Sequence, residues 1–262
     1  NIVIPINITK LGIGVFDSCS GLTSIEIPSS VTSIGNRAFY GCSGLTSIVV
    51  ASGNTKYDSR NNCNAIIETA SNTLIVGCKN TIIPNTVTSI GNSAFGGCSG
   101  LTSIEIPNSV TTIGESAFYG CTGLTKIFIP KSVTTISASS VYRSVFYDCS
   151  SNLVIYCEAS SKPDGWGTYW NYRTDSAIHT TYWGKTYEDC YPTEYSVSVG
   201  KYSLSPNAGC SYSVSPSTIL STGTEVTYKA VVSDGYRFMG WYDSSSGGEL
   251  VSNNETYVTT LY

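Results

Sequence analysis

Charged residues are scarce in this chain. Asp, Glu, Lys and Arg make up 12% of its 262 residues, whereas about 25% is usual in globular proteins. The surface must therefore be covered largely by Ser, Thr, Asn, Gly and Tyr. The net charge is -4 and no cluster of Lys and Arg occurs, so tight binding to nucleic acid lacks its electrostatic basis.

Histidine is almost absent as well, which removes most general-base and metal-ligand schemes. His179 is the only histidine, and Asp175 before it and Cys190 after it are close enough to suggest a hydrolytic Cys/His pair. A single His among aromatic residues is more often a structural hydrogen-bonding residue. Carboxylates are scattered singly and no C-x-x-C pair occurs. We therefore predict no catalytic residue, no metal site and no cofactor.

Long apolar runs are also missing. None approaches the roughly 20 residues that span a bilayer, and the first residues do not form a signal segment. Ile2-Val3-Ile4-Pro5 instead matches Ile25-Glu26-Ile27-Pro28. We expect the chain to begin inside a repeat, with any targeting segment upstream.

What the chain does contain is a repeat marked by proline. The interval from Pro5 to Pro28 is 23, and the same interval separates Pro84, Pro107 and Pro130. These five prolines mark rungs one to five within residues 1–157. The interval from Pro28 to Pro84 is 56, which is 23 plus an insertion of 33 at about 51–83. Such self-similarity predicts a solenoid, in which each rung buries its apolar residues only against its neighbours.

Each rung reads as two short strands and a turn. Ile25 and Ile27 alternate with polar residues, which predicts a strand that Pro28 ends. Val31 and Ile34 predict a second extended segment, and residues 37–41 a short helical or 3₁₀ turn that buries Phe39. Phe16, Phe95, Phe118 and, displaced by five residues, Phe146 occupy the same position in other rungs.

The outward positions of the longer strands form a column on the predicted concave face. Its residue types change from rung to rung while the inward positions barely change, as a binding surface would require. A solvated sheet face is the alternative. The candidate binding residues are Ser24, Glu26, Ser47, Val49, Ser103, Glu105, Lys126 and Phe128.

Half of the ten cysteines follow the repeat, each three residues after the repeat phenylalanine. Stacked positions lie roughly 4.8 Å apart, more than the roughly 3.8 Å between the Cβ atoms of a disulfide. We predict a column of buried thiols, with cross-rung disulfides as the alternative. Cys63 and Cys78 flank a possible hairpin and could form a bridge. The column comprises Cys19, Cys42, Cys98, Cys121 and Cys149.

Residues 158–191 are rich in aromatic side chains. Trp166, Trp170 and Trp183 could form a platform for sugar rings. The other interpretation is a cap, because the last rung of a solenoid must be covered.

The unit I-P-x-S-V-T-x-I-G-x-x-A-F-x-G-C-x-x-L-T-x-I resembles the BspA-type leucine-rich repeats of bacterial surface proteins, over about residues 1–157. The insertion resembles a hairpin-bearing variant of the same repeat. This resemblance implies a right-handed solenoid, secretion or surface display, binding to proteins of a host or a neighbouring cell, and no enzymatic activity.

A different pattern begins near residue 192, where short alternating segments predict β strands. The G-Y-x-F-x-G-W-Y segment at 235–242 resembles the divergent B-repeat of internalin-type surface proteins, a small β-grasp-like module. This match would make residues 192–262 a separate domain.

The expected molecule is mainly β: a leucine-rich-repeat solenoid (1–157), an aromatic cap or linker (158–191) and a β-grasp-like domain (192–262). We expect a non-enzymatic protein of the cell exterior whose partner is an extracellular protein or glycoprotein. Nucleic acid and small-molecule cofactors are not expected, and the oligomeric state is left open. A carbohydrate-binding module based on the three tryptophans is the alternative function.

Overall fold

A computed structural model describes residues 2–191 and, further on, the backbone of five strands within 210–260. The chain divides into two compact units, Asn1–Cys190 and Tyr191–Tyr262. Each is described by itself.

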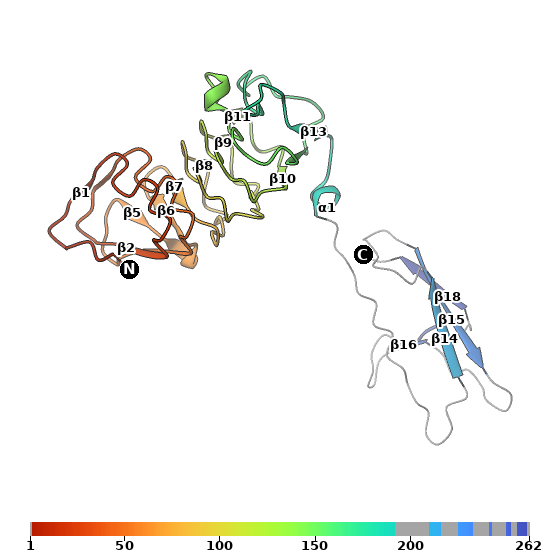
Figure 1. Cartoon of the computed structure of the whole chain (residues 1–262). Helices are drawn as coiled ribbons and strands as arrows, with labels where there is room; N and C mark the ends of the chain where they lie inside the picture. Colours follow the sequence, from red (N-terminus) through yellow and green to blue (C-terminus); the bar gives the residue numbers. More distant parts are fainter. Residues whose placement is uncertain are drawn as a thin grey trace. The chain divides into compact units, whose positions relative to one another are not determined.

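The first unit is a solenoid of stacked turns (Figure 1). Its longer strands pair in parallel in two sheets, β2-β4 and β10-β12-β13, and its shorter strands form the sheets β1-β3 and β11-β9-β8-β7-β6-β5. The longer strands are β2 (Ser24–Ile27), β4 (Ser47–Val50), β10 (Lys126–Ile129), β12 (Val154–Cys157) and β13 (Thr180–Trp183). The shorter strands of the repeats are β1 (Lys10–Leu11), β3 (Ser33–Ile34), β8 (Ser89–Ile90), β9 (Thr112–Ile113) and β11 (Thr135–Ile136).

Strand register equals the repeat period. Ser24 pairs with Ser47, and Thr112 with Thr135, an offset of 23 in both pairs. Lys126 pairs with Val154 instead, an offset of 28 that contains the five extra residues of the fifth rung. The prediction of a stacked repeat is confirmed at this level. Three expected longer strands are wrong, because residues 2–4, 81–83 and 103–106 precede a repeat proline without forming a paired strand, although 103–106 keep the alternation of exposed and buried residues.

The insertion adds an antiparallel element to the shorter-strand sheet. It contains β5 (Tyr57–Asp58), the 3₁₀ helix η1 (Arg60–Asn62), β6 (Ala65–Glu68) and β7 (Thr73–Gly77). β6 pairs antiparallel with β5 and with β7, and β7 then pairs parallel with β8. The predicted hairpin is confirmed, and its second strand takes the place of a short repeat strand.

Residues 37–41, where we expected a short helical or 3₁₀ turn, have 3₁₀-type hydrogen bonds but form no regular helix. In rung two, Ala38 N donates to Gly35 O and Tyr40 N to Arg37 O, as in a 3₁₀ turn. Arg37 and Gly41, however, have φ values of +55° and +70°, and left-handed residues cannot continue a right-handed helix. The remaining short helices of this unit are η2 (Val141–Arg143), in the five extra residues of rung five, and α1 (Tyr187–Cys190).

The repeat phenylalanines stack through the interior. Phe118 lies between Phe95 and Phe146, with ring centroids 5.1 and 5.6 Å away and planes within 8° of parallel. Phe16 and Phe39 form a separate pair, 5.1 Å apart. The insertion lies between the two stacks, and the buried apolar residues accordingly form two clusters.

The repeat glycine serves close approach between rungs. A Cβ added to Gly35 would lie 2.5 Å from Ile13 N, and one added to Gly114 would lie 2.6 Å from Asn92 N. Neither glycine has a positive φ. A side chain at these two positions is therefore excluded by the neighbouring rung.

The cysteine column consists of thiols. Cys42 Sγ donates to Phe16 O at 3.1 Å, Cys121 Sγ to Phe95 O at 3.2 Å, and Cys149 Sγ to Phe118 O at 3.0 Å. Each thiol thus bonds the carbonyl of the repeat phenylalanine in the preceding rung. Cys63 and Cys78 are also thiols, so the proposed bridge between them is not formed.

The second unit contains β14 (Cys210–Ser215), β15 (Glu225–Val232), β16 (Trp241–Tyr242), β17 (Leu250–Ser252) and β18 (Thr256–Thr260). β15 pairs antiparallel with β14 and β18, and β16 pairs antiparallel with β17. Residues 192–209, where alternating segments were expected to begin, and residues 235–240 of the B-repeat-like segment lie outside the described residues. The β-grasp assignment stays a prediction.

The phenylalanine stack predicts unequal costs of truncation along the solenoid. Phe118→Ala leaves a cavity between two rings and is expected to lower the free energy of unfolding by about 3–5 kcal/mol. Phe16→Ala removes a half-buried ring at the end of a stack and should cost clearly less. Urea unfolding followed by circular dichroism measures both, and equal losses would contradict the stacking described above.

The thiol column predicts that cysteine is protected by burial. Burial raises the pKa of Cys98 and Cys149 to about 12 and that of Cys42 to about 11, which disfavours the reactive thiolate. All eight cysteines from Cys19 to Cys157 should be alkylated in denaturant without prior reduction, and far more slowly in the native protein. Mass spectrometry that finds fewer than eight modified sites in that range would reveal disulfides.

Candidate functional site

The predicted binding column lies on the outer face of the longer strands. Glu26 and Val49 are exposed and directly opposite each other in the β2-β4 pair. Ser24 and Ser47 are half-buried beside them, and Ser103 and Glu105 are exposed in the unpaired segment. Lys126 is half-buried on β10.

Phe128 is the exception among these residues. We expected an exposed apolar side chain, but only 7% of it is accessible. Tyr187 of α1 meets its ring edge-to-face, with centroids 5.6 Å apart. The chain beyond the last rung therefore covers Phe128, and the prediction that it is available to a partner is wrong.

Three residues of this face escaped the sequence argument. Ile82 stands two residues before Pro84, as Glu26 stands before Pro28, and is 73% exposed. Tyr156 and Tyr182 are the strand partners that follow Phe128, and their rings lie 5.6 Å apart. The offset from the repeat proline would have found Ile82. We call Glu26, Val49, Ile82, Glu105, Tyr156 and Tyr182 the strand face.

The tryptophans do not form a sugar platform. Trp166 and Trp170 are each 2% exposed and belong to the core. Trp166 Nε1 donates to Val133 O at 3.0 Å, and Trp170 packs on Phe146 with centroids 6.3 Å apart. Trp183 is half-buried, with its ring plane inclined by 41° to that of Trp166. Because their faces lie against the fifth rung, these residues cover the end of the solenoid.

His179 is likewise a packing residue. It is 1% exposed, Nε2 lies 3.1 Å from Phe146 O, and Nδ1 has no hydrogen-bond partner. Burial lowers the pKa of His179. Cys190 is buried too, and Asp175 is paired with Arg173. Because His179 and Cys190 are both buried, they cannot contact a substrate in an open cleft. The structure therefore does not support a hydrolytic Cys/His pair.

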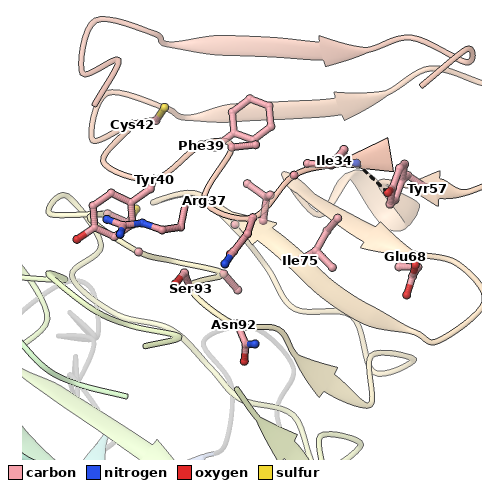
Figure 2. A pocket seen from close by; sticks show the side chains of 18 residues that line it. Ile34, Arg37, Phe39, Tyr40, Cys42, Tyr57, Glu68, Ile75, Asn92 and Ser93 are labelled. Atoms are coloured by element: carbon pink, nitrogen blue, oxygen red, sulfur yellow. Dashed lines mark hydrogen bonds between the residues drawn. The ribbon is translucent and has the colours of Figure 1, made fainter. Parts of the chain in front are cut away.

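A second surface lies where the insertion meets the repeats. Gly41 N of rung two donates to Gly96 O of rung three, as stacked rungs do. The neighbouring carbonyl, Ala94 O, accepts instead from Gly77 N at the end of β7. Rungs two and three are therefore hydrogen-bonded to each other between Gly41 and Gly96, and next to this bond β7 lies between them. Figure 2 shows the resulting space, with Arg37 and Tyr40 facing Asn92 and Ser93.

This space consists of two neighbouring hollows that share Asn36, Arg37, Tyr40, Asn92 and Ser93. The first, of about 300 Å³, extends past Ile75 to Tyr57 and Glu68. The second, of about 440 Å³, extends to Glu115, Tyr119, Tyr142 and Arg143. We call this second hollow the notch. Its walls comprise three Tyr, two Arg, two Asn, two Ser and one Glu.

A row of tyrosines borders the notch. Tyr40, Tyr119 and Tyr147 follow the repeat phenylalanine in their rungs, and rung three has Gly96 at that position. A Cβ at Gly96 would lie 2.6 Å from Tyr40 Cδ2, so the glycine lets Tyr40 lean across and reach Tyr119, with centroids 5.7 Å apart. Tyr119 and Tyr147 are 5.6 Å apart. The sequence argument missed this row, although the repeat alignment contains it.

The two arginines of the notch differ in their partners. Arg143 forms an ion pair with Glu115 at 2.8 Å, and hydrogen bonds from Ser139 and Arg143 hold the pKa of Glu115 below its usual range. Arg37 lies over the ring of Tyr40, with Cζ 3.9 Å from the centroid, a favourable cation–π geometry. Among the described residues, no carboxylate forms an ion pair with Arg37.

Neither surface offers a metal-binding group. Within residues 2–191 and the described strands, no three His, Cys, Asp or Glu side chains lie together as ligands would. No helix in the same residues has the length and apolar character to cross a bilayer.

These features define a leucine-rich-repeat solenoid. The family described as the BspA type leucine-rich repeat region matches residues 1–74 and 71–162 in six copies, and the chain belongs to this family. The proline spacing in the sequence had indicated five rungs, one fewer than the six copies matched by the family.

Solved structures of other repeat proteins are similar to this chain. A leucine-rich repeat protein from Eubacterium ventriosum is 28% identical, over 58% of this chain and 41% of its own, with a TM-score of 0.43. A leucine-rich cell surface protein from Faecalibacterium prausnitzii is 21% identical, over 70% of this chain and 53% of its own, with a TM-score of 0.43. The chain thus spans about half the length of these two proteins. A comparison with curated proteins found no match.

The environment of His179 predicts a pH dependence of stability. Buried His179 stays neutral where an unfolded His, with a pKa near 6.5, takes up a proton. Because the unfolded state then binds more protons, the free energy of unfolding should fall as the pH is lowered from about 7 to about 5. Urea midpoints at several pH values measure this slope. His179→Gln should flatten it, and an unchanged slope would contradict the assignment.

Proposed function

We propose that this protein is a non-enzymatic, secreted or cell-surface protein that binds an extracellular protein or glycoprotein through the strand face. Membership of the BspA-type family supports the class. The low charge and the Ser-, Thr- and Asn-rich surface support a location outside the cell. The right-handed course of the solenoid belongs to the same proposal.

One observation carries the choice of surface. Along the strand face the residues are acidic, aliphatic or aromatic in different rungs, whereas the inward residue before them is a buried Ile in five rungs (Ile25, Ile48, Ile104, Ile127 and Ile155) and Thr only before Ile82 and Tyr182. The interior is fixed by packing, so the outward positions are the ones free to vary with a ligand. Tyr182 and Ile82 are exposed there, and Tyr is among the residue types that contribute most to binding at protein interfaces.

The second unit fits a spacer, a stalk or a further contact in this proposal. Its antiparallel pairs β14-β15-β18 and β16-β17, together with the G-Y-x-F-x-G-W-Y segment, support an internalin B-repeat-like module.

The test is binding of the full chain to a panel of extracellular-matrix glycoproteins, intact and deglycosylated, by biolayer interferometry. The combined variant Ile82→Ser, Glu105→Lys and Tyr182→Ser should weaken binding at least about tenfold, since it removes two anchors and reverses one charge. The matched control is Ile13→Ser with Ile178→Ser, which changes exposed apolar residues away from this face. Equal losses in both variants, or none in the first, would overturn the choice of surface.

A further inference from the structure

The notch has a property that the repeat does not require. At the position two residues before the repeat phenylalanine, the backbone is left-handed in four rungs, with φ of +59° at Gly14, +55° at Arg37, +52° at Ser93 and +55° at Ser116. The fold therefore fixes the backbone at this position and not the side chain. Glycine adopts this conformation without strain and arginine does not.

The backbone of Arg37 also lacks the partner that its counterparts have. Gly14 N donates to Asn36 O, Ser93 N to Glu115 O and Ser116 N to Arg143 O. Among the described rungs, the equivalent bond from Arg37 to Asn92 is not formed, because β7 separates the rungs there. The notch thus combines an exposed guanidinium, an open rung edge and tyrosine side chains.

We propose that the notch binds a carboxylate-bearing sugar, with Arg37 pairing to the carboxylate and the tyrosines packing against the pyranose ring. This site shares no residue with the strand face, so the inference stands apart from the proposed function. A guanidinium without a carboxylate partner matches a ligand carboxylate in bidentate geometry.

The walls favour a sugar over a peptide. All ten residues that line the notch are Tyr, Arg, Asn, Ser or Glu, so no aliphatic side chain is available to an apolar residue of a ligand. Amide and hydroxyl groups instead donate to and accept from the hydroxyls of a sugar, and guanidinium groups donate to them. Tyr119 and Tyr142 add aromatic surface with a polar tip. The volume of about 440 Å³ lies within the range of about 300–1,000 Å³ usual for small-ligand sites.

The experiment is isothermal titration calorimetry of the full chain with the methyl glycosides of N-acetylneuraminic acid and glucuronic acid. Each sugar is compared with its methyl ester, which keeps the ring and removes the charge, and with a hexapeptide of alternating Asp and Ser. We expect at least one acidic sugar to bind, and its ester to bind at least about tenfold more weakly.

Arg37→Gly is the informative variant, since it removes the guanidinium at a position where glycine suits the backbone. It should weaken binding of the acidic sugar at least about tenfold while leaving the thermal unfolding temperature unchanged or higher. Tyr142→Ser alters a side chain that is 74% exposed and should weaken binding severalfold without loss of stability. Lys162→Gln is the control, because it removes one exposed positive charge outside the notch.

Each possible result either supports or contradicts the proposal. Loss of binding in Arg37→Gly with native stability, and retention in Lys162→Gln, supports the proposal. Binding of neither sugar, equal binding of acid and ester, unchanged binding in Arg37→Gly, or preferential binding of the acidic peptide with dependence on Arg37 would overturn it.

Discussion

The structure depends on backbone hydrogen bonds between equivalent positions of successive rungs. Thr32 N donates to Thr9 O, Thr111 N to Thr88 O and Thr134 N to Thr111 O, so each residue lies beside its own counterpart. Every other regularity follows from this stacking. An inward side chain must fit against a copy of itself, which explains the columns of Ile and Phe. The repeat glycine must leave room for the backbone next to it, and the thiols of Cys42, Cys121 and Cys149 donate to the equivalent carbonyl of the preceding rung.

Stacking also determines where the chain is free to change. A substitution at Ile127 or Phe118 alters the packing against both neighbouring rungs. A substitution at Glu105 alters only a side chain that faces solvent. The ends of the stack are the exception, because the last rung has no copy to pack on. Trp166 and Trp170 solve this problem with side chains larger than those of the repeat, and α1 extends the cover as far as Phe128. The aromatic segment is therefore explained by packing, without a ligand.

Period, inward residues and the thiol column could be predicted from the sequence because each depends on residues at matching positions. Features that depend on a break in the period could not. Phe128 was expected to be exposed because its position in the rung is outward, and nothing in the repeat announces that the helix α1, much later in the chain, lies on it. Residues 37–41 were expected to form a short helical or 3₁₀ turn because the length allows either. The left-handed backbone at Arg37 and its counterparts carries no sequence signature where the residue is Arg or Ser instead of Gly. The notch depends on two departures from the repeat, the hairpin that contains β7 and the replacement of Tyr by Gly96. The sequence does not show that these two departures lie next to each other in space.

The two candidate surfaces use this fold in different ways. The strand face exists because the register is kept: outward positions recur at a constant spacing, and their identity is the one variable along the column. The notch exists because the register fails, since β7 takes the carbonyl of Ala94 and leaves the edge of rung two without its partner. A regular solenoid offers long, shallow surfaces, and an enclosed site needs an interruption of the stack. Arg37 stands at that interruption, on a backbone that would accept glycine more readily, and its guanidinium contacts a tyrosine that only a neighbouring glycine allows to lean across. Departures that coincide in this way at one place, on a scaffold that is otherwise uniform, are more simply explained by a ligand than by the requirements of folding.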